Sequence, residues 1–520
     1  MTCSSPKCIL LLVLILFARS GDLLFSQQVA PNFHYRVSID DPQNQKIQVN
    51  LNVWVGENDT VTLKMPNWMP GYYQLMNYSE QVSNVIAKGE DGTEIPITEL
   101  NSNTWQLKSD KNSEIMLSYE VKADKKFVAN SLVDSTHAYL IPAGLFMYLE
   151  GEINRPVSVT VDVDRWADVA TGLKQISDDK RTYFAEDFDV LYDSPFLIGE
   201  LEELPSFEVK GVKHRFIGYE MGEFDRVAFM QNLKKVVESS VEIMRDIPFE
   251  EYTFIAIGPG RGGIEHLNNT TVSFDGKQME DKEGVLRMMN FLAHEYFHHY
   301  NVKRIRPFEL GPFDYDKGTK TNLLWVSEGL SVYYEYLVTL RGGLMSEKEL
   351  FENLESNINE FENDPGKVHQ SLVEASFATW GDGPFGTMAK GPDRSISYYA
   401  KGPVVGMLLD FAIRNASENK LSLDDVMRRL YTHYYQNLGR GFTDAEFQQT
   451  CEEMAGIPLT EIFEYVYTTK ELDYDTFLGY AGLEIKENKT GTEAAKFTIS
   501  RMNNLDSLQS SIQNSWLEGK

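Results

Sequence analysis

Hydrophobic and polar residues alternate strictly along several segments of the first 200 residues. The segment FHYRVSI places every second residue from Phe33 to Ile39 on one face, and IQVNLNVWV does the same from Ile47 to Val55. The segments IMLSYEV and VSVTVDV repeat the pattern. A period of two residues predicts strands with one buried face. We therefore expect residues 30–200 to form an antiparallel sheet or a sandwich.

The period of the hydrophobic pattern changes near residue 222. The segment EFDRVAFMQNLKKVVESSVEIM places its apolar residues on one helical stripe, made of Val227, Phe229, Leu233, Val236, Val237, Val241 and Met244. A short strand, YTFIAI, follows at 252–257, and the rest is predicted to be mostly helical to about residue 470, including 346–364, 403–415 and 443–455. The pattern indicates a multidomain α+β protein with a boundary near residues 200–220.

The net charge of the chain excludes some classes of binding partner. The 520 residues include 49 basic and 77 acidic side chains, which gives a net charge of -28. A surface this acidic repels phosphate groups, so we expect no nucleic-acid partner and no anionic membrane partner.

The first residues indicate export. Lys7 precedes the apolar run ILLLVLILF, and polar and small residues follow it. We interpret residues 1–26 as a secretory signal peptide, with a membrane anchor as the alternative, because a spanning helix needs about 20 apolar residues. Later stretches are too polar to span a bilayer, so the mature protein is expected in the periplasm or secreted, free of the membrane. After cleavage Cys451 remains, and we expect it to pack in a core.

A metal-binding pattern lies in VLRMMNFLAHEYFHHY. His294 and His298 are four residues apart on a predicted helix, so both rings can point toward one ion. Glu295 can take a proton from a water molecule at that ion. This H-E-x-x-H arrangement is typical of zinc hydrolases. His299 lies about 100° around the helix from His298 and is expected to pack or to support the site rather than to bind the ion.

A catalytic zinc needs a third protein ligand and one open position. The segment LLWVSEGLSVYYEYL contains Glu328 on a second predicted helix, where a carboxylate among apolar residues is costly unless it is paired or coordinating. Glu335 faces roughly the same side and is the rival. We favour Glu328 because of its local context beside the Glu-Gly step.

These residues resemble a known family. The segments HEYFHHYNVKRIRP and LLWVSEGLSVYYEYL, with LKMPNWMPGYYQLMNYSEQV and DSPFLIGELE nearer the N-terminus, resemble the glycyl aminopeptidase family of gluzincin metallopeptidases. The resemblance implies one zinc ion bound by His294, His298 and Glu328. It also implies a thermolysin-like catalytic domain behind an N-terminal β domain.

The resemblance implies two further groups of site residues. GGIEH at 262–266 is similar to the motif whose glutamate holds the free α-amine of a peptide, which gives that role to Glu265. Gly262 and Gly263 allow the substrate to approach the backbone closely. SYYAKG at 397–402 is similar to the motif whose tyrosine stabilises the oxyanion, and Tyr399 matches it.

The C-terminal end departs from the family pattern. Family members commonly carry a PDZ domain, and FLGYAGLEI resembles its first strand, but few residues follow it. We expect a degenerate or truncated PDZ-like tail. The expected division of the chain is a signal peptide at 1–26, a β domain at 27–205, a catalytic domain at 206–472 and this tail at 473–520.

The expected activity is removal of N-terminal residues, glycine and alanine above all, from peptides with a free N-terminus. Glu295 would act as the base. Two alternatives stay open. A zinc endopeptidase of the same fold would not need the free amine, and a peptide-binding scaffold would not cut at all.

Overall fold

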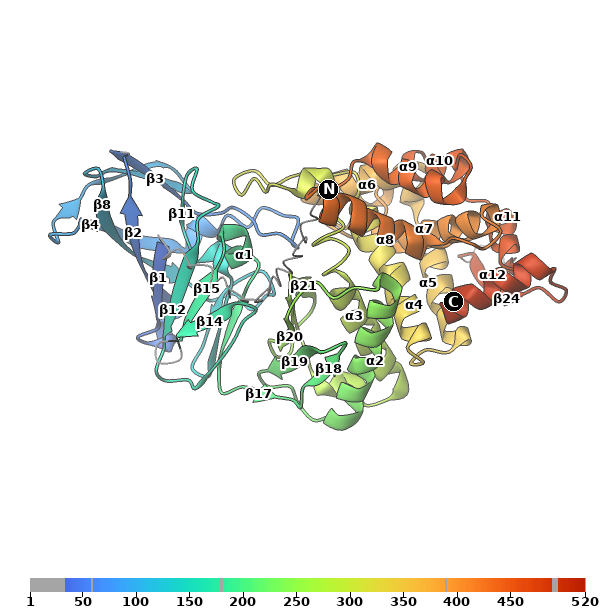
Figure 1. The fold of residues 1–520 in the computed structure, drawn as a ribbon, viewed down its shortest axis with the longest axis horizontal. Coiled ribbons are helices and arrows are strands. Elements are labelled where there is room, and N and C mark those ends of the chain that lie inside the picture. The colour runs from blue at the N-terminus through green and yellow to red at the C-terminus, as the bar shows by residue number, and fades with distance from the viewer. Residues whose placement is uncertain (1–32, 58, 178–180, 389–390, 489–493, 520) are drawn as a thin grey trace, which may run out of the picture.

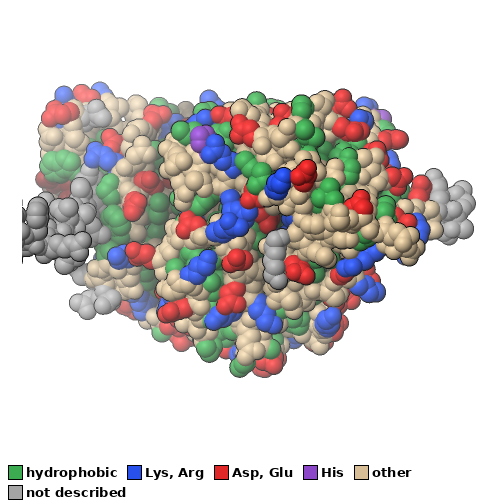
Figure 2. All heavy atoms as spheres, turned by 45° about the vertical axis from the view of Figure 1, so that its right-hand side comes forward, with side chains coloured by type: hydrophobic (Ala, Val, Ile, Leu, Met, Phe, Trp, Pro, Cys, Tyr) green, Lys and Arg blue, Asp and Glu red, His purple; other side chains and the backbone are tan. Residues whose placement is uncertain are grey.

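The structure is a computed structural model that describes residues 33–57, 59–177, 181–388, 391–488 and 494–519. The predicted signal peptide lies outside the described residues. Figure 1 shows a β-rich half and a mainly helical half side by side, as the sequence predicts. Among the described residues, no helix combines the length and the apolar character that crossing a membrane requires. Acidic and basic side chains both spread over the face in Figure 2.

The β-rich half is built on one large sheet. Its eight strands lie in the order β14-β15-β12-β1-β2-β8-β4-β5. The bounds are β1 (Phe33–Ser38), β2 (Lys46–Val55), β4 (Val82–Gly89), β5 (Glu94–Ile95), β8 (Ser113–Lys122), β12 (Val157–Asp162), β14 (Lys174–Ser177) and β15 (Thr182–Ala185). The predicted alternation is confirmed in β1 and β2, whose odd-numbered apolar residues are buried. The pairing is antiparallel except between β1 and β12.

Two four-stranded sheets complete this half, and their apolar residues share one core with the large sheet. One contains β9 (Leu132–Val133), β10 (His137–Leu140), β13 (Asp168–Ala170) and β16 (Phe196–Gly199). The other contains β3 (Thr60–Lys64), β6 (Ile97–Asn101), β7 (Thr104–Lys108) and β11 (Tyr148–Leu149). A short helix, α1 (Phe188–Tyr192), follows β15.

The second half begins with a six-stranded sheet. Five strands lie in the order β17-β19-β20-β22-β21, and β18 pairs with β19. The bounds are β17 (Glu202–Glu203), β18 (Phe207–Val209), β19 (Val212–Gly218), β20 (Glu251–Ala256), β21 (Gly263–Glu265) and β22 (Asn269–Val272). The strand β21 is antiparallel to β22 and forms the outer edge of the sheet.

Helices make up most of the remaining chain and share a second large core with this sheet. They are α2 (Arg226–Met244), α3 (Lys282–Phe297), a π-helical segment (Trp325–Gly329), α4 (Leu330–Arg341), α5 (Glu347–Glu362), α6 (Leu372–Asp382), α7 (Tyr398–Ala416), α8 (Leu423–Leu430), a second π-helical segment (Tyr431–Asn437), α9 (Asp444–Ala455), α10 (Thr460–Tyr467) and α11 (Tyr474–Tyr480). The predicted helices at 346–364, 403–415 and 443–455 correspond to α5, α7 and α9. Cys451 is buried in α9, as expected.

Two details of the sequence interpretation are wrong. Val227 is 66% exposed, because it lies in the first turn of α2, before the helix reaches the core. In FLGYAGLEI the residues from Phe477 to Tyr480 are helical, and the strand β23 begins only at Leu483, after Gly482 has taken a positive φ of 65°. The helix ends at Tyr480, and Gly482 supplies the turn that a residue with a side chain rarely adopts.

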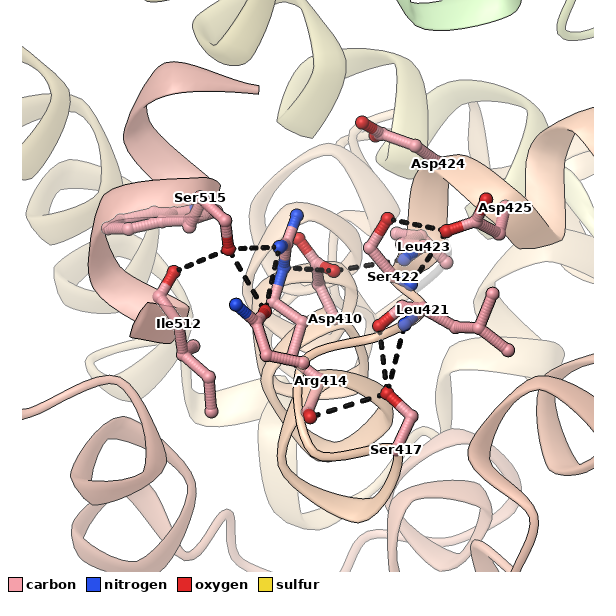
Figure 3. A network of polar contacts seen from close by, with 12 residues as sticks. Asp410, Arg414, Ser417, Leu421, Ser422, Leu423, Asp424, Asp425, Ile512 and Ser515 are labelled. Carbon is pink, nitrogen blue, oxygen red and sulfur yellow. Dashed lines mark hydrogen bonds and ion pairs between the residues drawn. The ribbon is translucent and has the colours of Figure 1, made fainter. Parts of the chain in front are cut away.

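The C-terminal segment packs on the helical half. The strands β23 (Leu483–Asn488) and β24 (Lys496–Arg501) pair, and α12 (Ser507–Glu518) follows. Figure 3 shows Arg414 of α7 reaching toward Ser515 of α12, with the Nη1–Oγ distance at 2.8 Å. Arg414 also forms a buried ion pair with Asp410. Polar contacts therefore fix α12 against α7.

One segment of the β-rich half crosses to the helical half. The indole Nε1 of Trp68 donates to the carbonyl oxygen of Asp314 over 2.7 Å, and its ring packs edge-on against Trp380. Lys64 Nζ lies 2.6 Å from Asp316 Oδ2. These contacts anchor the loop that carries the Pro-Gly step at Gly71 and bring it to the site described below.

Candidate active site

Three side chains predicted to bind a metal ion converge in the helical half. The Nε2 atoms of His294 and His298 lie 2.8 Å apart. Glu328 Oε2 lies 3.5 Å from the first and 3.3 Å from the second. All three residues are buried. His294 lies in the last turn of α3, His298 immediately follows that helix, and Glu328 lies in the first π-helical segment.

The other ring nitrogens face acceptors: His298 Nδ1 makes a hydrogen bond, and His294 Nδ1 lies close to a carboxylate without hydrogen-bond geometry. His298 Nδ1 donates to the carbonyl oxygen of Asn301 over 2.6 Å, and His294 Nδ1 lies 3.0 Å from Glu335 Oε2. A ring that carries its proton on Nδ1 presents a lone pair at Nε2. Glu335, the rival ligand in the sequence, therefore contacts the outer side of His294 rather than the cluster.

These donors fit a zinc ion. Two imidazole lone pairs and a carboxylate face one point, and such a buried set repels itself unless a cation lies between. Zinc bonds of about 2.0 to 2.1 Å in a tetrahedron require ligand atoms about 3.3 Å apart, which matches two of the three observed separations. The pKa of Glu328 reflects the same setting. Burial opposes its charge, but His298 and His294 outweigh burial and hold the pKa well below its ordinary value.

Glu295 lies one residue beyond the first histidine and points to the same region. A Cβ atom on Gly263 of β21 would lie 2.6 Å from the Glu295 carboxylate, so glycine is required for this approach. Thr270 Oγ1 donates to Glu295 Oε2 over 3.3 Å. Burial raises the pKa of Glu295 to about 7, the two histidines oppose that shift, and Glu265 and Glu328 add to it. A carboxyl group with a pKa near neutrality can both take and return a proton.

Tyr399 is brought to Glu328 by the packing of α7. Its hydroxyl donates to Glu328 Oε2 over 2.8 Å. Gly329 and Gly402 make this possible, because a Cβ atom on either would lie 2.7 Å from the Cα atom of the other. The sequence interpretation missed this pair of glycines, although they are the final residues of the SEG and AKG steps.

Glu265 ends the edge strand β21 close to the cluster. Its side chain is buried, and Oε1 has no hydrogen-bond partner among the described residues. A Cβ atom on Gly71 would lie 3.2 Å from both Glu265 carboxylate oxygens. The β-rich half therefore closes one side of this carboxylate.

A buried polar network that the sequence did not indicate supports β21. Asp193, at the end of α1, accepts hydrogen bonds from His266 Nδ1 over 3.0 Å, from the backbone N–H of Leu267 over 2.7 Å and from Lys303 Nζ over 2.7 Å. It connects the β-rich half, the end of β21 and the loop after α3. The only sequence feature that marks Asp193 is the DSP step at 193–195. The residues that it contacts lie far away in the sequence.

His299 points away from the cluster. It packs against Tyr300, Tyr296 and Phe249, and neither ring nitrogen has a hydrogen-bond partner among the described residues. Burial lowers the pKa of its ring well below the ordinary value. It lies in the aromatic core behind the site.

Comparisons with known proteins agree with this geometry. Residues 34–200 match the Peptidase M61 N-terminal domain, and residues 287–405 match the M61 glycyl aminopeptidase family. Comparison with curated proteins finds no match.

Solved structures share the fold. An aminopeptidase N family protein from Idiomarina loihiensis is 26% identical, with a TM-score of 0.83 over 88% of this chain and 79% of its own. An M1 zinc metallopeptidase from Deinococcus radiodurans is 12% identical, with a TM-score of 0.52 over 85% and 94% of the two chains. Yeast LTA4 hydrolase in complex with bestatin is 14% identical, with a TM-score of 0.52 over 86% and 67%. The last two likenesses concern the fold alone.

Proposed function

Because this chain belongs to the M61 glycyl aminopeptidase family, we propose that it is a zinc aminopeptidase that hydrolyses the first peptide bond of peptides with a free N-terminus. One observation carries the proposal. The cluster of His294, His298 and Glu328 lies beside both a buried base, Glu295, and a buried carboxylate, Glu265, whose Oε1 has no hydrogen-bond partner among the described residues.

His294, His298 and Glu328 would hold one zinc ion. When bound, zinc supplies a Lewis acid that polarises a carbonyl oxygen and lowers the pKa of water at the site. Asn301 and Glu335 keep the two imidazole rings oriented for that role.

Glu295 would move the proton. Its carboxylate takes a proton from the attacking water and returns it to the departing amine. The missing side chain at Gly263 leaves the backbone of β21 next to that carboxylate, where the scissile bond would lie. The Tyr399 hydroxyl would donate to the developing oxyanion.

Glu265 would hold the free α-amine. A buried carboxylate without a partner is costly, and an ammonium group satisfies it with a charge-assisted hydrogen bond. Gly262 and Gly263 let the peptide backbone approach the strand. An endopeptidase would have no use for this carboxylate.

We further propose that small first residues are preferred. A cavity of about 80 Å³ lies against Glu265, with Gly71, Tyr73 and Phe313 among its lining residues. This space accommodates the side chain of alanine and disfavours long or aromatic ones. The proposal also places the protein outside the cytoplasm, on the pattern of residues 1–26.

Chromogenic substrates test the proposal. Glycyl-p-nitroanilide and alanyl-p-nitroanilide should be cleaved, N-acetylalanyl-p-nitroanilide should not, and a chelator should stop the reaction until zinc is restored. Glu265→Gln should lower kcat/KM for the free-amine substrates about 100-fold, since it removes a charge-assisted contact. Cleavage of the acetylated substrate would establish an endopeptidase or esterase instead. Zinc binding without any cleavage would favour a peptide-binding scaffold.

A further inference from the structure

The free edge of β21 offers backbone groups to a peptide. Ser273 N–H donates to the Gly262 carbonyl, and His266 N–H donates to the Asn269 carbonyl, both over 3.0 Å. In an antiparallel pair the residues alternate between facing the partner and facing away. Gly263 and Glu265 therefore turn their backbone N–H and C=O groups away from β22, toward the outer edge. An extended peptide can add there as a further strand.

The amine site fixes the direction of such a peptide. With its amine at Glu265, the peptide passes Gly263, beside the Glu295 carboxylate, and continues toward Gly262 and Arg261. An extended chain advances about 3.4 Å per residue. Arg261 lies four residues before Glu265, about 14 Å of extended strand, so with the reach of the arginine side chain the third or fourth residue of the peptide would lie near Arg261.

A pocket of about 380 Å³ lies at that end of β21. Its lining includes Lys126, Val128, Tyr139, Gly260 and Arg261. It is continuous with the edge strand, because a Cβ atom on Gly262 would lie 3.8 Å from Val128 Cγ2. The pocket therefore lies between the β-rich half and the loop before β21.

The pocket presents positive charge in an acidic protein. Arg261 and Lys126 both line it, and neither forms an ion pair with another described residue. Burial lowers the pKa of His137, which also lines the pocket. Asp134, beside His137, accepts hydrogen bonds from the backbone and side chain of Thr136 and from the His137 backbone, which hold its carboxylate against its own loop, and it is not among the residues that line the pocket. Both side chains are exposed, and two cations without partners beside one pocket suit an anionic ligand.

We propose that Arg261 and Lys126 bind the C-terminal carboxylate of a short peptide whose amine is held at Glu265. This inference rests on the proposed aminopeptidase function and names the substrate class: peptides of three or four residues with a free carboxyl terminus. The substrate amine is bound by a negative charge at one end of the edge strand, and the substrate carboxylate is bound by positive charges beyond its other end. Longer peptides lose the second contact.

Paired substrates test this role. The enzyme should cleave Gly-Ala-Ala with a kcat/KM about 10- to 100-fold above that of Gly-Ala-Ala-amide, which is the range for one or two charge-assisted hydrogen bonds. Arg261→Gln and Lys126→Gln should each reduce that ratio, mainly through KM, and should leave glycyl-p-nitroanilide unaffected. Lys125→Gln is the matched control, because Lys125 is an exposed neighbour that does not line the pocket.

Two results would overturn the inference. One is an equal kcat/KM for acid and amide. The other is an equal loss of kcat/KM for the acid and for the amide when Arg261 is replaced by Gln. Cleavage of glycyl-p-nitroanilide in the same assay would keep the aminopeptidase proposal standing. Calorimetric titration of Glu295→Gln with the same two peptides provides a readout that needs no turnover. Tighter binding of the acid, lost in the Arg261→Gln, Glu295→Gln double variant, supports the inference, and equal binding contradicts it.

Discussion

At the scale of single residues, the site depends on which nitrogen of each histidine carries the proton. His298 is fixed by a backbone carbonyl and His294 by the carboxylate of Glu335. Glu328 and Glu335 are seven residues apart, close to two helical turns, so they share a face. Glu328 lies near Nε2 of His294, and Glu335 lies near Nδ1 of the same ring.

Because the two glutamates contact different nitrogens, measurements of zinc affinity can distinguish their roles. Glu335→Gln should weaken zinc affinity about 10- to 100-fold, as loss of a partner behind a metal-binding histidine does. Glu328→Gln should weaken it far more, because it removes a proposed ligand. Competition with a calibrated chelator measures both. If Glu335→Gln costs as much as Glu328→Gln, the assignment of the third ligand to Glu328 is wrong.

Local spacing was enough to predict that His294, His298 and Glu328 converge. His294, Glu295 and His298 follow from the repeat of a helix, and Glu328 follows from the cost of a carboxylate among apolar residues. The contact of Gly263 with Glu295 could not be predicted in the same way. It joins an edge strand to a helix, and no local pattern encodes such a contact between distant segments.

At the scale of elements, the sequence predicted several of the longer strands and helices but not the way they meet. Alternation and helical stripes depend only on which face is buried. The π-helical segment at Trp325–Gly329 depends on its neighbour α7. The two backbones are so close at Gly329 and Gly402 that a Cβ atom on either glycine would clash with the other. Segments of this kind are frequent at functional sites. This one turns Glu328 toward Tyr399.

The contact between β19 and α3 makes stability depend on pH. His214 is buried, donates from Nδ1 to the Val212 carbonyl over 3.0 Å, and has Nε2 3.0 Å from the Tyr296 hydroxyl. Burial lowers the pKa of His214 to about 4. Between pH 6.5 and 4 the unfolded chain binds a proton that the folded chain does not, so stability falls as the pH falls.

The free energy of unfolding of the wild type should fall between pH 8 and pH 5. We expect this fall to be about 2 kcal/mol smaller in His214→Gln. Urea unfolding at the two pH values, with a chelator present so that metal release does not contribute, measures the difference. His369→Gln, at an exposed position, is the control and should keep the wild-type pH dependence. An unchanged loss in His214→Gln would show that this histidine does not remain neutral in the folded protein.

At the scale of the whole molecule, two large cores meet at the site. The Trp68 segment and Asp193 connect the β-rich half to the helical half: Trp68 contacts Asp314, and Asp193 contacts Lys303 and His266, the residue after Glu265. The change of hydrophobic period near residue 222 predicted two different halves. The contacts of Lys64, Trp68 and Asp193 between them could not be predicted, because the partners lie between 73 and 312 residues apart.

The C-terminal helix α12 connects to the same site from the opposite side. Trp516 is fully buried, and its Nε1 donates to the Tyr333 hydroxyl over 2.8 Å. That hydroxyl donates to Asp410 Oδ2 over 2.8 Å. Tyr333 lies in α4, between Glu328 and Glu335. The helix α12 therefore supports α4 at Tyr333, which lies between Glu328 and Glu335 in the chain, and the sequence analysis did not predict α12.

Trp516→Ala should lower the free energy of unfolding by about 3 to 5 kcal/mol, because it empties a large buried volume and removes a hydrogen bond to Tyr333. The denaturant midpoint and the temperature of half-inactivation should fall together, while kcat on glycyl-p-nitroanilide at 25 °C stays close to wild type in the fraction that is folded. Trp54→Ala is the matched control, since Trp54 is 51% exposed on β2 and its loss should cost less than about 1 kcal/mol. If both variants unfold at the same denaturant concentration, α12 is not part of the cooperative core. The support of α4 must then come from its other neighbours, chiefly α3 and α7.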